Sequence, residues 1–147
     1  MSGVQLRAGF SNDLIRLHLA RLAIANAEGY TTAREDIGEY MVGEVQDNLD
    51  GQKLYDGSAM PQSAAAIKRP GKTLIDKHHL YDSYVFQLSP GAVEIGSALV
   101  YAAIHHFGGK TGRKKKTNIV ARPVLGVAAP QENRIGDILI GAVGAIQ

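Results

Sequence analysis

The chain has 147 residues, with 16 Lys or Arg against 14 Asp or Glu and a formal net charge of +2 at pH 7. A chain of this length is expected to form one domain whose core needs no disulfides. Because it contains no cysteine, disulfide frameworks, thiolate metal sites and cysteine nucleophiles are excluded. No apolar run approaches the roughly 18 residues that a membrane-spanning helix needs, so we expect no membrane partner.

Charge is distributed unevenly along the chain. Residues 1–50 contain four arginines and eight acidic residues, a net charge of −4, whereas residues 51–147 contain twelve cations and six acidic residues, a net charge of +6. Such polarity lets the acidic part of one copy meet a basic part of another, or turns a basic loop toward a polyanion. The alternative is that the acidic residues are the solvated faces of two helices.

The first predicted helix begins near Ser11-Asn12-Asp13, which are good N-cap residues, and ends at about Ala27, before Gly29. Its apolar residues cover more than one face of the helix, which implies burial on two sides. The covering surfaces are either a sheet and another helix of the same chain, or a neighbouring subunit. The apolar residues are Leu14, Ile15, Leu17, Leu19, Leu22 and Ile24.

A second helix is predicted from about Ala33 to Leu49. Thr32 and Glu35 have the spacing of a capping box, in which each side chain bonds the backbone N–H of the other residue. One apolar stripe runs along the helix and predicts a single buried face. The stripe consists of Ile37, Tyr40, Met41, Val45 and Leu49.

Residues 52–77 show little periodicity and are rich in glycine, proline and small polar residues. An unstructured connection of this length is unusual inside a compact domain. It is either an exposed binding arm or a segment that becomes ordered only in an assembly, and we favour the second interpretation. Residues 64–68 have the composition for one helical turn, which Pro70-Gly71 would end.

A β-hairpin is predicted next. Apolar residues alternate from Tyr84 to Leu88, the segment Ser89-Pro90-Gly91 turns the chain, and a partner strand returns through residues 93–95. The two strands should therefore pair in antiparallel fashion.

The hairpin leads into a predicted short helix that Gly108 and Gly109 end. Bulky apolar residues recur there at i, i+4 and i+7, which predicts one buried face. His105 would point away from that face, which makes it a candidate for a subunit contact. The predicted buried face consists of Val100, Ile104 and Phe107.

Residues 110–116 contain five cations, displayed on a loop that is held at both ends. Because no aromatic residue is interleaved with them, the cluster suits phosphate neutralisation without base recognition. Three interpretations stay open: contact with DNA, a solvated loop that keeps subunits soluble, and docking on an acidic partner. The cations are Lys110, Arg113, Lys114, Lys115 and Lys116.

An extended segment after the loop ends at Arg122-Pro123. Arg122 lies between two small or rigid residues, and we expect it to pair with Glu94 and fix the fold. This arginine therefore has a predicted structural role, unlike the cations of the loop.

The chain ends in a predicted helix opened near Pro130. Three glycines each cost this helix about 1 kcal/mol relative to alanine, so it needs tertiary or intersubunit contacts to persist. These glycines are Gly136, Gly141 and Gly144. The apolar stripe is predicted to consist of Ile135, Ile138, Leu139, Ala142, Val143 and Ile146.

No pattern in the sequence is typical of an active site. The five histidines include two adjacent pairs, and adjacent residues on a helix project about 100° apart, so neither pair can chelate a metal locally. No serine occupies a Gly-x-Ser-x-Gly elbow, and residues 108–112 lack the spacing of a phosphate-binding loop. We therefore expect no catalytic residue, no metal and no cofactor.

Several short motifs follow one another in a recognisable order. A strand ends in Ile95-Gly96, then come Tyr101–Gly109, a variable polar loop and Ala121–Gly126. This order resembles the virion-morphogenesis, or tail-completion, family of Mu-like tailed phages. Two positions depart from the family, which usually has an aromatic residue at Val124 and a glutamine at His106. Upstream motifs in the same order are Ile37-Gly38, Asp56-Gly57 and Leu80-Tyr81-Asp82-Ser83.

The resemblance implies an α+β fold, a single domain over residues 1–147, in which N-terminal helices pack on a small antiparallel sheet with a β-hairpin, a short helix and a C-terminal helix. It also implies a structural virion protein without enzymatic activity, assembled in the host cytoplasm. The motif residues expected at structural or interface positions are Tyr101, His105, Phe107, Gly108, Gly109, Arg122 and Pro123.

The family's role places such a protein in the neck of the virion, as a homo-oligomeric ring that enables head–tail joining. Six subunits are the favoured number, and the expected partners are tail-tube or terminator proteins, head-connector proteins and, non-specifically, the translocating DNA. One alternative is a tail terminator ring that caps the tail tube. The alternative from another class is a sequence-independent DNA-binding protein that uses the basic loop at residues 110–116.

Overall fold

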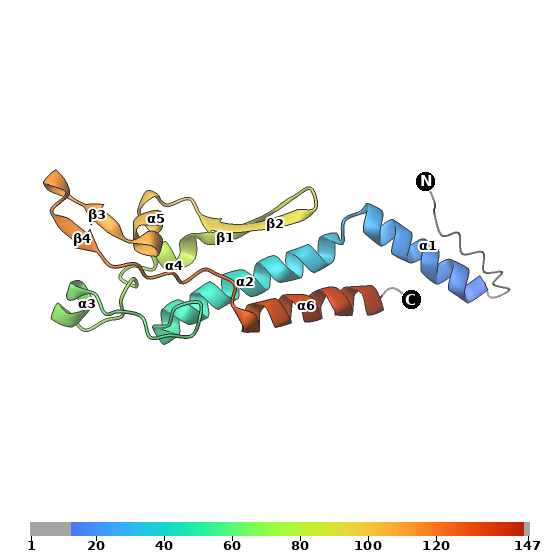
Figure 1. Ribbon diagram of the computed structural model, residues 1–147, viewed down its shortest axis with the longest axis horizontal. Helices are drawn as coiled ribbons and strands as arrows, with labels where there is room; N and C mark the ends of the chain where they lie inside the picture. The colour runs from blue at the N-terminus through green and yellow to red at the C-terminus, as the bar shows by residue number, and fades with distance from the viewer. Residues whose placement is uncertain (1–12, 146–147) are drawn as a thin grey trace, which may run out of the picture.

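The computed structural model describes residues 13–145, which form an elongated α+β molecule (Figure 1). This part of the chain contains six α-helices and two separate two-stranded antiparallel sheets, as the predicted fold class requires. The predicted N-cap at Ser11-Asn12 and the stripe residue Ile146 lie outside the described residues. The first helix, α1 (Asp13–Ala27), ends where predicted and extends beyond one end of the molecule (Figure 1).

The central element is α2 (Thr31–Gly51), whose predicted apolar stripe is confirmed. Ile37, Met41, Val45 and Leu49 are all buried, and the last two are fully buried. The predicted capping box is wrong, because the helix begins two residues earlier than expected. Tyr30 takes the N-cap position with φ 50°, and no side chain caps the helix; the Thr31 hydroxyl instead donates to the carbonyl of Glu28 at 2.9 Å.

The predicted hairpin is present as β1 (Tyr84–Ser89) and β2 (Ala92–Ser97), preceded by the short helix α4 (His79–Ser83). The hairpin packs on α2, where a Cβ at Gly38 would lie 2.3 Å from the Phe86 ring. Arg34 of α2 ties the hairpin turn to the start of the helix, because its guanidinium donates to the carbonyls of Gly29 at 2.7 Å and Ala92 at 2.8 Å.

The connection between α2 and α4 is packed against the body of the molecule. It contains the predicted helical turn as α3 (Ala64–Lys68), and it buries Met60, Ala66 and Thr73. The Gln52 side chain spans the connection, since its amide donates to the Thr73 carbonyl at 3.0 Å and its oxygen accepts from the Thr73 N–H at 2.7 Å. The interpretation that residues 52–77 become ordered only in an assembly stays a prediction.

The short helix α5 (Val100–Phe107) turns a different face inward than predicted. Ala102 is buried in the core, whereas Val100 is 94% exposed and Phe107 is 77% exposed. The small side chain of Ala102 lets the helix approach the core closely, so Val100 and Phe107 fall toward the outside and Ile104 is only half-buried. Periodicity identified the residues that share a face but assigned that face to the wrong side.

The main core gathers residues from four elements, α2, α4, β1 and α5, and from two connecting segments. Partly buried hydrophobic residues such as Leu54, Tyr81 and Leu125 pack against it. The fully or nearly buried members are Val45, Leu49, Met60, Leu80, Tyr84, Ala102 and Val124.

The basic segment is a second small hairpin rather than an irregular loop. It consists of β3 (Gly109–Thr111), a 3-10 turn (Arg113–Lys115) and β4 (Thr117–Ile119). The residue at position 114 has φ 58° and the residue at position 115 has φ 53°, so two lysines adopt left-handed backbone conformations at the tip. In Figure 1 this hairpin lies at the end of the molecule opposite α1.

The last helix, α6 (Ala129–Gly144), packs beside α2. Buried Gln131 holds its first turn: the side-chain oxygen accepts from the Ala128 N–H at 2.9 Å, and the amide donates to the Tyr55 carbonyl and to Glu44, each at 3.1 Å. The predicted stripe is only partly covered, because Leu139 and Val143 are 41% and 45% exposed.

We expect Gly38→Ala to lower the free energy of unfolding by about 1–3 kcal/mol, because its Cβ would overlap the Phe86 ring. Gly43→Ala on the same helix is the matched control: its Cβ would meet open space, so the gain in helix propensity should leave stability equal or higher. Chemical denaturation of both variants measures the difference, and equal stability of the two would contradict this packing.

Candidate functional site: assembly surfaces

The two motifs flanking the basic segment meet in space at the end of α5. The Arg122 N–H donates to the His105 carbonyl at 2.8 Å. Gly108, with φ 71°, permits this approach, because a Cβ there would lie 2.8 Å from the Ala121 nitrogen and 2.9 Å from the Ile119 carbonyl oxygen. Gly108 therefore lets the two ends of the basic hairpin come together at its base. The strands β3 and β4 extend outward from there.

Arg122 is 6% exposed and joins the motif to the connection. Its guanidinium donates to the carbonyls of Pro61 at 2.6 Å, Val120 at 3.1 Å and Gln62 at 3.4 Å. The predicted pair with Glu94 is wrong, since Glu94 accepts a hydrogen bond from Gln87 on the neighbouring strand. Burial lowers the pKa of Arg122.

The remaining motif residues also have defined places. The Pro123 carbonyl accepts from the Tyr55 N–H at 3.0 Å, which docks the motif on the connection a second time. Tyr101 lies edge-on to His105, with ring centroids 6.1 Å apart. Gly109, with φ 135°, begins β3, so each predicted motif glycine serves the turn into the basic hairpin.

His105 is half-buried, and its role as a subunit contact stays a prediction. Its Nδ1 atom is buried and has no hydrogen-bond partner within residues 13–145. Burial, and then the neighbouring Arg122 guanidinium, lower the pKa of His105 below its ordinary value. The imidazole is therefore kept neutral on the inner face of α5, beside the buried arginine.

A cavity of about 630 Å³ lies beneath these residues, between α5, α3 and α4. Cations outnumber carboxylates along its wall: Arg122 and Lys77 have no carboxylate partner among the described residues, while Arg69 pairs with Asp76. Within the same residues, no three His, Asp or Glu side chains lie together so that they could hold a metal ion. The cavity suits an anionic group better than a cation.

The five predicted cations of the basic hairpin are all exposed. Among the described residues, none of the five forms an ion pair. Concentrated charge on an outlying hairpin is available to a phosphate backbone or to an acidic protein surface.

Large apolar residues are exposed on four helices, of which α3 contributes only Ile67. On α1, Leu17, Leu19 and Ile24 are 47%, 53% and 57% exposed. The side chains of Leu14 and Ile15 lie outside those that the structure describes. Two further exposed apolar surfaces were not predicted. One consists of Val100 and Phe107 on α5, and the other of Leu139, Ile140 and Val143 on α6. In the sequence, such surfaces were signalled by the several apolar faces of the first helix and by the three glycines of the last helix, but not at α5.

An elongated subunit with apolar helix faces left open and no evident catalytic cluster among its described residues is typical of a protein that acts by assembly. The family described as the Phage virion morphogenesis family matches residues 11–144. The chain belongs to this family, and it therefore has a structural or assembly role in the virion.

One relative is the Mu-like prophage FluMu G protein 2 of Haemophilus influenzae, which is 41% identical to this chain over 71 residues. The similarity covers 48% of this chain and 49% of the relative, so the chain spans about half the length of the curated relative that it matches. No solved structure matches the chain. Across the described helices, none combines the length and apolar character needed to cross a membrane.

We expect Arg122→Met to lower the free energy of unfolding by about 2 kcal/mol or more, because three carbonyls on two segments lose a charged donor. Glu94→Ala should cost less than about 0.5 kcal/mol, since that carboxylate is exposed and bonds only Gln87. Denaturant unfolding of the two variants compares them; a larger cost for Glu94→Ala would restore the pairing predicted from sequence.

Stability should depend on pH through His105. The unfolded chain takes up the proton at the ordinary pKa and the folded chain only at a lower one, so the stabilising contribution is complete above about pH 6.5 and is lost as the pH falls through the lower folded pKa. We expect the loss of unfolding free energy between about pH 7.5 and about pH 5.5 to be smaller in His105→Gln than in the wild type. An equal loss in both proteins would show that another group causes it.

Proposed function

We propose that this chain is a tail-completion subunit that forms a ring at the head–tail junction and enables head–tail joining. The observation that carries the proposal is the combination of family membership with apolar surfaces on α1, α5 and α6 that the rest of the described chain leaves uncovered. Burial of those surfaces against sister copies and adjoining virion proteins would supply the free energy of assembly.

The arrangement of charge supports a directional assembly. The basic hairpin lies at one end of the molecule, while acidic residues such as Glu35, Asp36 and Glu39 lie exposed on α2, toward the other end (Figure 1). Subunits that join head to tail in a closed ring place unlike surfaces in contact at every interface. In the proposed neck, the ring would contact the tail tube or its terminator on one side and the head connector on the other.

The basic hairpin supports a further element of the proposal. If the hairpins project into the ring, each copy offers five exposed cations to passing DNA, without aromatic residues that would stack on bases. Contacts of this kind neutralise phosphates and permit sliding. The same observation favours the second candidate function, a free sequence-independent DNA-binding protein. Among structural virion proteins, the alternative to a head–tail joining ring is a tail terminator ring.

The triple change Lys114→Ala, Lys115→Ala and Lys116→Ala separates these functions. Because the lysines lie on the hairpin tip, outside the apolar surfaces, we expect the oligomer mass from size-exclusion chromatography with light scattering to stay unchanged. A free DNA-binding protein would instead show duplex affinity as a monomer, falling steeply with salt and lost in the triple variant.

Localisation tests the proposal directly. A reconstruction of the neck of purified virions should contain density for this chain as a closed ring. Absence of the chain from purified particles, or a wild-type protein that stays monomeric under all assembly conditions, would contradict the proposed function.

A further inference from the structure

Within residues 13–145, helix α1 makes no extensive packing contact with another helix or strand. It does not run along any other helix or strand of the described residues, and it leaves the body of the molecule at the turn formed by Glu28–Tyr30 (Figure 1). Leu17 and Ile24 stand seven residues apart, two helical turns, and therefore share one exposed face. A helix of 15 residues is only marginally stable without tertiary contacts.

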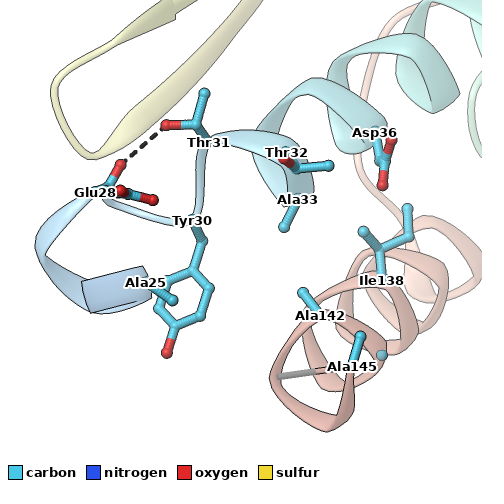
Figure 2. Close-up of a pocket in the computed structure, with 11 residues that line it drawn as sticks. Ala25, Glu28, Tyr30, Thr31, Thr32, Ala33, Asp36, Ile138, Ala142 and Ala145 are labelled. Atoms are coloured by element: carbon cyan, nitrogen blue, oxygen red, sulfur yellow. Dashed lines mark hydrogen bonds between the residues drawn. The ribbon is translucent and has the colours of Figure 1, made fainter. Parts of the chain in front are cut away.

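A groove suited to a helix lies close to this turn. It has a volume of about 480 Å³ and lies where the end of α1 and the turn after it, with Ala25 and Glu28, meet the first turns of α2 and the last turns of α6 (Figure 2). Its walls are built mainly from small side chains, among them Ala33, Gly141, Ala142 and Ala145, with Tyr30 and Ile138 as the larger lining residues. Small residues let the backbone of a second helix approach closely.

Packing within the described residues does not explain why α6 has glycine at three positions. A Cβ built at Gly136, Gly141 or Gly144 would meet no atom within 4 Å. Glycine weakens a helix, and nothing packed against these three positions in the described chain requires its small size. Gly141 lies in the wall of the groove, where a neighbouring helix would require a residue without a side chain.

The negative charges on the wall of the groove favour an occupant that carries positive charges. Glu28 and Asp36 lie on its wall, and none of its lining residues is a cation. The helix α1 carries two exposed arginines, Arg16 and Arg21, beside its apolar face. The apolar floor with carboxylates at its edge thus complements an apolar helix face that is flanked by guanidinium groups.

We propose that α1 of one copy occupies the groove between α2 and α6 of a second copy. The inference rests on the proposed ring and specifies its interface: a helix at one end of each subunit fills a groove of the next. Gly29, with φ 67°, and Tyr30, with φ 50°, form the turn from which α1 is directed toward the neighbour. Such a contact joins two different surfaces, so it can close a ring.

Cysteine cross-linking tests the contact in the full chain, which has no native cysteine. Leu17→Cys and Ala142→Cys are prepared separately, mixed and oxidised, so that a disulfide between the two positions can form only between molecules. We expect a covalent dimer of the mixed pair in non-reducing gels. Leu17→Cys mixed with Val85→Cys is the control, because Val85 is 60% exposed but lies on the hairpin, away from the groove.

The cross-linking outcomes separate the possible occupants. A Leu17–Ala142 product at least tenfold above the control supports the inference. A product that joins two copies of Ala142→Cys, without the mixed product, would place α6 of the second copy in the groove and overturn it. Equal yields in the test and control mixtures would also overturn it.

Filling the groove gives an independent measurement. Gly141→Leu meets no atom of its own subunit at Cβ, so the fold should persist by circular dichroism while the dissociation constant of the oligomer rises at least tenfold. Gly43→Leu, also an open helical glycine but outside the groove, should leave association unchanged. A Gly141→Leu protein that assembles like the wild type overturns this interface and leaves the ring proposal standing, whereas a monomeric wild type overturns both.

Discussion

The rest of the structure depends on the buried face of α2. On one side the hairpin of β1 and β2 packs so closely that Gly38 must lack a side chain beneath the Phe86 ring. On another side α6 is joined to the helix through the hydrogen bond from Gln131 to Glu44. At its C-terminal end, Gln52 fastens the long connection through two hydrogen bonds to Thr73. One helix thus sets the positions of every other packed segment, and none of these segments covers its whole length.

Burial is deepest in the C-terminal half of α2, although Ala33, Ile37 and Gly38 are also buried in its N-terminal half. The fully buried residues Val45 and Leu49 belong to the cluster that receives Met60, Leu80, Ala102 and Val124. Toward the N-terminal half, α6 shows Leu139, Ile140 and Val143 to solvent, and α1 leaves the body altogether. The molecule therefore combines a buried core with open apolar surface on α1, α5 and α6. The residues that stabilise the fold are thus different from those left uncovered.

The elements that depend on local pattern were predictable from the sequence. The stripe of α2, the alternation and turn of the hairpin, the helical turn at residues 64–68 and Pro130 at the start of α6 all follow from spacing and residue type. Predictions failed where a partner far away in the chain decides the outcome. The buried face of α5 was assigned wrongly because spacing alone does not reveal that Ala102, and not Val100, meets the core. Arg122 binds backbone carbonyls about sixty residues away. Because every residue has a backbone carbonyl, the sequence does not indicate which ones an arginine will bind.

Tyr55 occupies a junction with a mechanical consequence. Its ring lies against Gly126, where a Cβ would come within 2.5 Å, its N–H donates to the Pro123 carbonyl, and its own carbonyl accepts from Gln131 at the start of α6. Three segments that are remote in sequence therefore lock at one residue. Detachment of the connection would free the anchor of α6 and the base of the basic hairpin together, so these regions open as a single cooperative unit. A force applied to the basic hairpin would therefore reach the start of α6 through the hydrogen bonds that Tyr55 makes with Pro123 and Gln131.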